Sequence, residues 1–181
     1  MSALPKYVPH YTLAEYAQWQ GEWELWQGVP VAMSPSPFGR HQWVAGEIAY
    51  QLNHSLRDQC KDCFVLTETD WIVSEDTIVR PDVVIVCGPF PERHILAPPR
   101  LIVEVLSPAT EEKDRNAKKD LYAMQAVDFY LLVDPIGKKV EAFQLESVTG
   151  KYVRRSIQDR MAFELSKTCV AQLELLALFR I

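Results

Sequence analysis

The stretch that decides the fold class is Arg100-Leu-Ile-Val-Glu-Val-Leu-Ser-Pro108. Five aliphatic residues lie within it, a pattern typical of a strand that is buried on both faces of a sheet. Glu104 interrupts this apolar run. An ionised carboxylate in such a strand is strongly destabilised by burial unless it is paired with a cation or bound to a metal. The stretch therefore predicts a central strand whose single acid needs a partner.

Residues 83–86 and 129–133 are two further aliphatic runs, and they predict two more buried strands. Residues 40–58 and 111–126 carry apolar side chains at helical spacing and predict amphipathic helices. The inward face of the first helix is expected to carry Trp43, Val44, Ile48, Leu52 and Leu56. Strands with intervening helices indicate an α/β fold, with a central mixed β-sheet flanked by helices.

Shorter patterns complete this outline. Residues 12–20 predict a short helix, because Thr12 can cap it and Glu15 can complete a capping box. Alternation predicts an N-terminal hairpin at 22–33, strands at 64–67 and 71–73, and a hairpin formed by 140–145 and 152–154. Residues 170–179 fit helix or strand equally well. With no internal repeat and no long linker, we expect one domain over residues 1–181.

Composition excludes several classes of protein. The chain has no apolar run near the ~20 residues that cross a bilayer, so we expect a cytoplasmic protein without membrane attachment. A net charge of −5 argues against non-specific coating of nucleic acid. It is compatible with a nuclease, whose active site must hold cations. The motifs of phosphate-loop, dinucleotide-binding, esterase and zincin enzymes are absent from the sequence.

Four cysteines are too few for a disulfide scaffold, and we expect a reducing compartment to keep them as thiols. Two of them form the motif Cys60-Lys-Asp-Cys63. The sequence offers no second pair in register and no nearby histidine, so we interpret this motif as a turn with two thiols rather than a zinc site.

Asp82 stands at the start of a buried strand, in Arg80-Pro-Asp82, and Glu104 follows in the next predicted strand. If the two strands are neighbours, the two carboxylates meet at one end of the sheet. Converging carboxylates, waters and a backbone carbonyl make the oxygen-only site that Mg²⁺ prefers. The alternative is that Glu104 forms a structural ion pair with a lysine or arginine, or faces solvent.

The ordered set of motifs resembles a bacterial family of restriction-endonuclease-like proteins within the PD-(D/E)xK nuclease superfamily. The motifs are Pro81-Asp82, Glu104-Val-Leu-Ser-Pro108, Asp114-Arg-x-x-Lys118-x-x-x-Tyr122, Tyr130-Leu-Leu-Val-Asp-Pro135, Trp23-Glu-Leu-Trp-Gln-Gly28, Met33-Ser-Pro-Ser-Pro37 and His41. The resemblance covers a core of about residues 10–178. It implies a restriction-endonuclease-like fold and the hydrolysis of phosphodiester bonds.

The resemblance also implies roles for particular residues. Asp82, Glu104 and the Val105 carbonyl are expected to bind Mg²⁺, for which Mn²⁺ can substitute. The superfamily's lysine normally stands two residues after the acid, where this chain has Leu106. Lys118 is the matching position on the following helix. The remaining candidates are Glu24 as a third carboxylate, His41, Tyr122, and Lys119 as the second choice for the lysine.

Helical spacing supports Lys118, because Asp114, Lys118 and Tyr122 follow at intervals of four and share one face. Three of these candidates also have a purely structural interpretation. Lys118 fits a surface ion pair with Asp114, Glu24 fits a solvent-facing strand, and His41 fits a helix end. Basic residues near the site could contact phosphates or only solvent; these are Arg93, His94, Arg100, Lys113, Arg115, Lys118 and Lys119.

From these observations the sequence predicts a Mg²⁺-dependent endonuclease that cleaves DNA. We expect a homodimer, because two sites related by a twofold axis most simply cut both strands of a duplex. The alternative is a nuclease fold that binds nucleic acid or protein with a weak or absent active site.

Overall fold

The main sheet of the chain is mixed, as predicted. The structure is a computed structural model, and it describes residues 9–33 and 38–180. Six strands lie in the order β10-β9-β8-β7-β6-β3. Their bounds are β3 (Cys63–Thr67), β6 (Val83–Cys87), β7 (Leu101–Val105), β8 (Phe129–Asp134), β9 (Lys139–Glu146) and β10 (Lys151–Arg154). Strands β7 and β8 are parallel, and the other neighbours are antiparallel.

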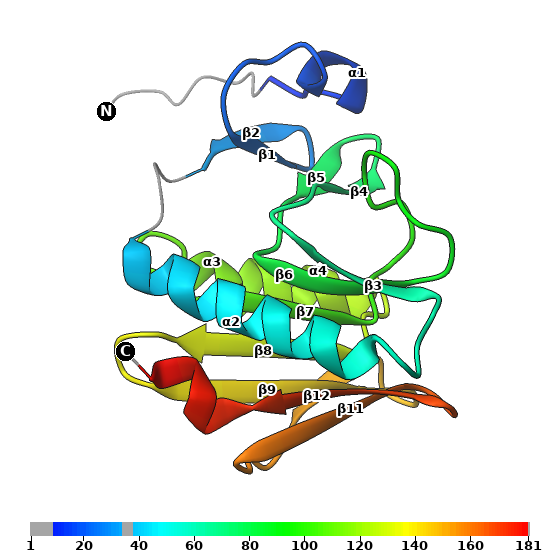
Figure 1. The fold of residues 1–181 in the computed structure, drawn as a ribbon. Coiled ribbons are helices and arrows are strands. Elements are labelled where there is room, and N and C mark those ends of the chain that lie inside the picture. The colour runs from blue at the N-terminus through cyan, green and yellow to red at the C-terminus, as the bar shows by residue number, and fades with distance from the viewer. Residues whose placement is uncertain (1–8, 34–37, 181) are drawn as a thin grey trace.

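Two smaller sheets flank the main one (Figure 1). The first has the order β2-β1-β5-β4, with β1 (Trp23–Trp26), β2 (Val29–Ala32), β4 (Trp71–Ser74) and β5 (Thr77–Val79). It contains the predicted N-terminal hairpin. The second pairs β11 (Arg160–Ser166) with β12 (Cys169–Glu174), and a 3₁₀ helix, η2 (Leu175–Phe179), follows. The segment 170–179 thus divides into strand and helix, and strands β5 and β11 were not predicted.

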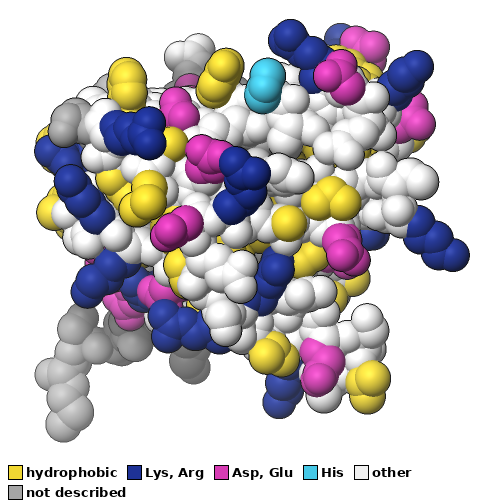
Figure 2. Space-filling model, turned by 60° about the horizontal axis from the view of Figure 1, so that its bottom comes forward, with side chains coloured by type: hydrophobic (Ala, Val, Ile, Leu, Met, Phe, Trp, Pro, Cys, Tyr) yellow, Lys and Arg dark blue, Asp and Glu magenta, His cyan; other side chains and the backbone are white. Residues whose placement is uncertain are grey.

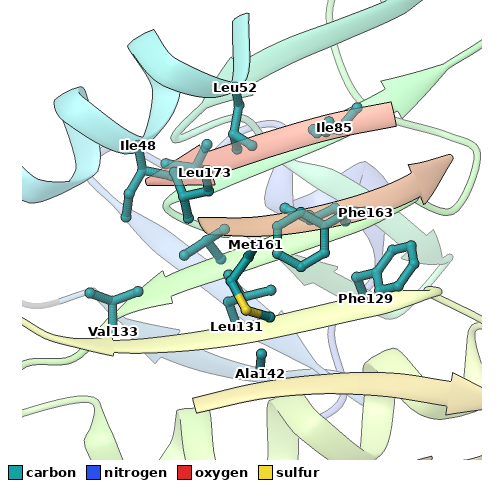
Figure 3. Packing of buried hydrophobic residues seen from close by; sticks show 14 of the residues in the cluster. Ile48, Leu52, Ile85, Phe129, Leu131, Val133, Ala142, Met161, Phe163 and Leu173 are labelled. Atoms are coloured by element: carbon teal, nitrogen blue, oxygen red, sulfur yellow. The ribbon is translucent and has the colours of Figure 1, made fainter. Parts of the chain in front are cut away.

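The long helix α2 (Gly39–Leu56) lies along one face of the main sheet (Figure 1). Its apolar side chains pack with those of β11 and β12 against the strands in one continuous core. Figure 3 shows Ile48 and Leu52 of α2 beside Leu173, with Met161 and Phe163 above Leu131. The prediction that Trp43 belongs to this face is wrong, because its side chain is 53% exposed.

A second core fills the opposite face of the main sheet. There Tyr122 and Tyr130 pack near Trp71, below the helical segment that follows β7. The predicted single helix over 111–126 is three short pieces: α3 (Glu111–Lys113), a π-helical turn η1 (Asp114–Lys118) and α4 (Lys119–Met124). Because side chains alternate along β7, Glu104 points to this second face together with Ile102.

The N-terminal helix α1 (Leu13–Tyr16) is shorter than predicted. Its capping box is present, since the Thr12 backbone N–H donates to the Glu15 carboxylate at 2.8 Å. In the turn between β1 and β2, Gly28 has a φ of +79°. A Cβ there would lie 2.3 Å from the His10 ring, so both conformation and space require glycine. Within the described residues, no helix is long and apolar enough to cross a membrane.

The expectation that the four cysteines remain thiols is wrong. The structure joins Cys60 to Cys169 and Cys63 to Cys87, so no thiol is free. The partners are 109 and 24 residues apart in sequence, and the fold brings them together. Cys63 and Cys87 are direct cross-strand neighbours in β3 and β6.

Candidate active site

The register of β6 and β7 brings Asp82 and Glu104 together. Val83 pairs with Val103, so Asp82, which precedes β6, stands opposite Glu104. The Asp82 carboxylate accepts a hydrogen bond from the Val105 backbone N–H at 2.7 Å. The predicted meeting of the two acids at one end of the sheet is therefore present in the structure.

Glu104 is 2% exposed and is held by two side chains from the helical segment above it. Lys118 Nζ donates to Glu104 Oε1 at 2.8 Å, and the Tyr122 hydroxyl donates to the same oxygen at 2.7 Å. A charge-assisted bond and a phenol bond together offset part of the cost of burying this carboxylate. The solvent-facing interpretation of Glu104 is excluded, whereas ion pairing with a lysine is observed.

Asp114, Lys118 and Tyr122 do share one buried face, with exposures of 1%, 4% and 0%. Lys118 Nζ lies 3.4 Å from Asp114 Oδ1, so this pair is an interior contact rather than a surface one. The π turn lies between the two residues, and such turns frequently occur at functional sites. Lys119 points elsewhere, with its Nζ 3.8 Å from the centre of the Phe143 ring.

Glu24 reaches the same cluster from β1 and is 1% exposed, so its solvent-facing interpretation is excluded. It lies 3.5 Å from Lys118 Nζ and accepts a bond from Lys113 Nζ at 2.5 Å. The Trp26 indole and the Arg80 backbone N–H also donate to it, each at 3.0 Å. A third carboxylate thus faces the lysine that pairs with Glu104.

His41 lies in the first turn of α2, beside Asp82. Its Nε2 is 3.4 Å from Asp82 Oδ2, and the Val105 backbone adjoins its ring. The side chain is 11% exposed and that of Asp82 is 21% exposed, so solvent reaches this side of the cluster. The neighbouring motif at residues 34–37 is outside the described residues.

Burial and mutual repulsion control the charges here. Burial alone lowers the pKa of Lys118, but Glu104, Glu24 and Asp114 raise it well above its usual value. Burial likewise raises the pKa of Glu24, but Lys118 and Lys113 hold it at about 2. For Glu104, burial raises the pKa despite Lys118, and the nearby carboxylate of Asp114 raises it further. Lys118 is therefore charged, and Glu104 is the acid that is hardest to ionise without another cation.

His41 shows the opposite balance from an ordinary buried histidine. Burial lowers its pKa, but the Asp82 carboxylate and the Val105 backbone outweigh burial and raise it. The His41 Nδ1 atom is buried and has no hydrogen-bond partner among the described residues. The neighbouring Asp82 carboxylate therefore stabilises the imidazolium form of this ring relative to an isolated buried histidine.

The carboxylate oxygens of this cluster are ligands that suit a divalent cation of the Mg²⁺ type. Four carboxylates (Asp82, Glu24, Glu104 and Asp114) face two lysines (Lys113 and Lys118), which leaves a formal excess of two negative charges. Among the described residues, hydrogen bonds and ion pairs use only Oδ2 of Asp82 and Oε1 of Glu104. The other oxygen of each acid remains available.

As the side chains lie, no group of three His, Cys, Asp or Glu residues among those described is placed to hold a metal together. Two carboxylates completed by water and a backbone carbonyl are nevertheless sufficient for Mg²⁺, which usually keeps several waters.

Some contacts were not expected from the sequence. Trp26 supports Glu24 from two residues away on the same face of β1, whereas no pattern along the chain relates Glu24 to the Arg80 backbone that also donates to it. Several predicted phosphate contacts are engaged internally: Arg100 pairs with Asp128, and Arg115 pairs with Glu111 and Glu141. Figure 2 shows basic and acidic side chains interspersed on the side of the molecule that lies at the bottom of Figure 1.

Comparison with models of protein families identifies the family of this chain. Residues 13–177 match the family model described as "Uma2: Putative restriction endonuclease". The chain belongs to the Uma2 family. The predicted family resemblance is confirmed. No curated protein matches the chain.

A solved structure has the same fold as this Uma2 protein. It is the crystal structure of a protein from Anabaena variabilis ATCC 29413, described as a putative nuclease belonging to DUF820. The two are 18% identical, the TM-score is 0.72, and the match covers 93% of this chain and 97% of the other. This likeness confirms the predicted restriction-endonuclease-like fold.

Proposed function

We propose that this chain is a metal-dependent endonuclease that hydrolyses phosphodiester bonds in DNA at the cluster of Asp82, Glu104 and Lys118. The observation that carries the proposal is the convergence of these three side chains from two strands and a separate helix. The lysine is absent from position 106, but the π turn brings Lys118 to within 2.8 Å of Glu104. Membership of the Uma2 family supports the same reaction.

Asp82, Glu104 and the Val105 carbonyl would hold the cation, which is Mg²⁺ in our proposal and replaceable by Mn²⁺. When bound, the cation lowers the pKa of a coordinated water and offsets the charge of the phosphate. Glu24, at 3.5 Å from Lys118, would fix the lysine from its second side. Tyr122 would keep Glu104 in one orientation through its hydroxyl.

Lys118 acts as a cation and not as a base in this proposal. Its pKa is raised well above the usual value by the surrounding carboxylates, so it holds its proton at neutral pH. A fixed positive charge stabilises the negative charge that develops on the phosphate oxygens during attack by water. His41, at the side of the cluster that solvent reaches, would contact the phosphate, and Asp82 raises the pKa of its ring and so supports a positive charge there.

The direct test is cleavage of supercoiled plasmid and of single-stranded DNA in Mg²⁺ or Mn²⁺, with and without chelator. Wild-type protein should cut, and both Glu104→Gln and Lys118→Met should lose at least about 100-fold in rate, the scale expected when a preorganised charge is removed. Lys119→Met is the matched control, since the neighbouring lysine lies on Phe143 and should cut normally. An intact substrate in all conditions, or undiminished cleavage by Glu104→Gln, rejects the proposal.

Metal binding can be measured without turnover. Calorimetric titration with Mn²⁺ should show one site in wild-type protein and none in Asp82→Asn. Sedimentation in the presence of duplex DNA tests whether the active species is the homodimer that we propose.

A second candidate function is a binding module that retains the fold. The observation in its favour is the closed Lys118–Glu104 pair, in which a lysine already occupies one oxygen of the buried acid without any metal. This module would bind DNA or a protein partner. Titration with Mn²⁺ would then release no heat of binding, and the protein would cleave no DNA in the presence of any metal ion.

A further inference from the structure

The four cysteines form one cluster at the opposite end of α2 from His41. These are all the cysteines of the chain. Cys60 follows the C-terminal end of α2, Cys63 begins β3, Cys87 ends β6 and Cys169 begins β12. The two disulfides lie against each other, with Cys63 Sγ and Cys169 Sγ 3.8 Å apart. One group of four sulfurs therefore joins four separate elements.

The four sulfurs are bonded in pairs, and their positions in the fold allow the reduced thiols to surround one ion. Zinc binds cysteine sulfur at about 2.3 Å, and a tetrahedron of that radius has edges of about 3.8 Å, the separation of Cys63 and Cys169 here. Two ligands come from a Cys-x-x-Cys turn, closed by a bond from the Cys63 N–H to the Cys60 carbonyl at 3.2 Å. Cys87 and Cys169 supply the second pair, which sequence register alone did not reveal.

We propose that the reduced chain binds one structural Zn²⁺ through Cys60, Cys63, Cys87 and Cys169, and that the two disulfides are the oxidised, metal-free form of the same cluster. Four sulfur ligands in a tetrahedron favour zinc or an iron–sulfur centre over hard cations. A single zinc ion is the assignment because the one separation between the two pairs, 3.8 Å, equals the edge of a sulfur tetrahedron around one such ion.

The surroundings suit a closed, negatively charged centre. Cys60 and Cys169 are 6% and 5% exposed, and Cys63 and Cys87 are partly buried, so the protein encloses most of the cluster, as expected for a structural site. A zinc tetrathiolate carries two net negative charges. Arg57 and Lys61 line the adjoining hollow of about 310 Å³ together with Cys60 and Cys63, and their positive charges oppose that excess.

The two forms interconvert by a balanced redox step. As disulfides the sulfurs offer no thiolate, so reduction by a dithiol must supply two electrons and two protons to each bond before zinc displaces the protons. In the reverse direction, two equivalents of a peroxide take four electrons from the four thiolates. Two S–S bonds then form, zinc leaves, and four protons taken from solvent complete the conversion of the peroxide oxygens to water.

This site is independent of the proposed nuclease site. Helix α2 has 18 residues and so is about 27 Å long, with His41 in its first turn and Cys60 beyond its last. The zinc site would fasten β12 to α2 and to the main sheet, an attachment that is otherwise made by side chains such as Ser55, which accepts from the Gln172 N–H at 3.1 Å. Its effect is on stability, with no group facing the substrate.

The experiment is metal analysis of the full chain, purified anaerobically with a dithiol reductant. One zinc per chain is expected, and replacement by Co²⁺ should give the visible absorption and sulfur-to-metal charge-transfer bands of a tetrahedral thiolate site. Asp82→Asn is the matched control and should keep its zinc, whereas Cys60→Ser and Cys169→Ser should lose it. Peroxide should release the zinc at about two equivalents per chain.

Wild-type protein also gives an answer if the serine variants do not fold. Zinc should protect all four thiols of the reduced chain against alkylation, and a chelator should remove that protection. The proposal is overturned by reduced protein that holds less than about a tenth of an equivalent of zinc and gives no cobalt bands. Bound iron in place of zinc, or zinc retained by Cys60→Ser, also overturns it.

Discussion

Replacing Lys118 by methionine should destabilise the metal-free protein strongly. The Lys118 side chain is 5% exposed, and its Nζ lies 2.8 Å from Glu104, 3.4 Å from Asp114 and 3.5 Å from Glu24. Methionine keeps much of the volume but leaves three buried carboxylates facing one another. Removing one partner of a buried ion pair costs about 3–5 kcal/mol, which for a chain of this size lowers Tm by roughly 6–20 °C.

The assay is urea unfolding in the presence of a chelator, followed by tryptophan fluorescence. Lys119→Met is the control, because it loses only a half-exposed contact with Phe143, worth about 0.5–1 kcal/mol. If Lys118→Met does not fold, the double variant Asp114→Asn/Lys118→Met removes one uncompensated acid and should recover part of the loss. A Lys118→Met protein that unfolds within 1 kcal/mol of Lys119→Met would refute the charge compensation argued here.

Three further outcomes can be checked by the same unfolding measurement. Tyr122→Phe should cost about 1–3 kcal/mol, because it removes the buried bond to Glu104 and leaves one oxygen with fewer donors. An equal loss in a Glu104→Ala background, which has no side-chain acceptor, would contradict this origin. Leu131→Ala should cost about 2–5 kcal/mol through a cavity between the main sheet and β11, whereas Leu176→Ala, at an exposed position, should change little. Gly28→Ala should cost at least about 1 kcal/mol from its positive φ and its contact with His10, and an alanine there that is as stable as wild type would show that the β1–β2 turn relaxes.

The sequence contained enough to predict the meeting of Asp82 and Glu104. Asp82 stands directly before one aliphatic run, and Glu104 lies near the end of the next. Antiparallel pairing of neighbouring strands places the start of the first strand beside the end of the second. Lys118 was found because helical spacing and the family motif agree on one face. Strand β11 has the alternation that sequence reasoning looks for, since Met161, Phe163 and Leu165 are buried and their neighbours are exposed, so that strand was missed despite a readable pattern.

Other features had no local pattern to detect. A π turn adds one residue to a helical turn without changing the kinds of residue involved, so residues 111–126 read as one continuous helix. The pairing of Cys60 with Cys169 depends on β12 packing beside α2, a contact across 109 residues. Glu24 and Trp26 lie in the smaller sheet and Lys113 lies in α3, so the contact between Lys113 and Glu24 depends on how that sheet sits against the helical segment.

The π-helical turn at 114–118 also constrains how this chain can change in length. Lys118 and Tyr122 reach Glu104 from opposite sides of the junction between that turn and α4. Gain or loss of one residue between Lys118 and Tyr122 would rotate one side chain relative to the other by about 100° and withdraw one donor from Glu104. The exposed Asn116 and Ala117 precede both donors and are free to vary in kind. Descendants of this gene that keep the lysine should therefore keep three residues between it and the tyrosine.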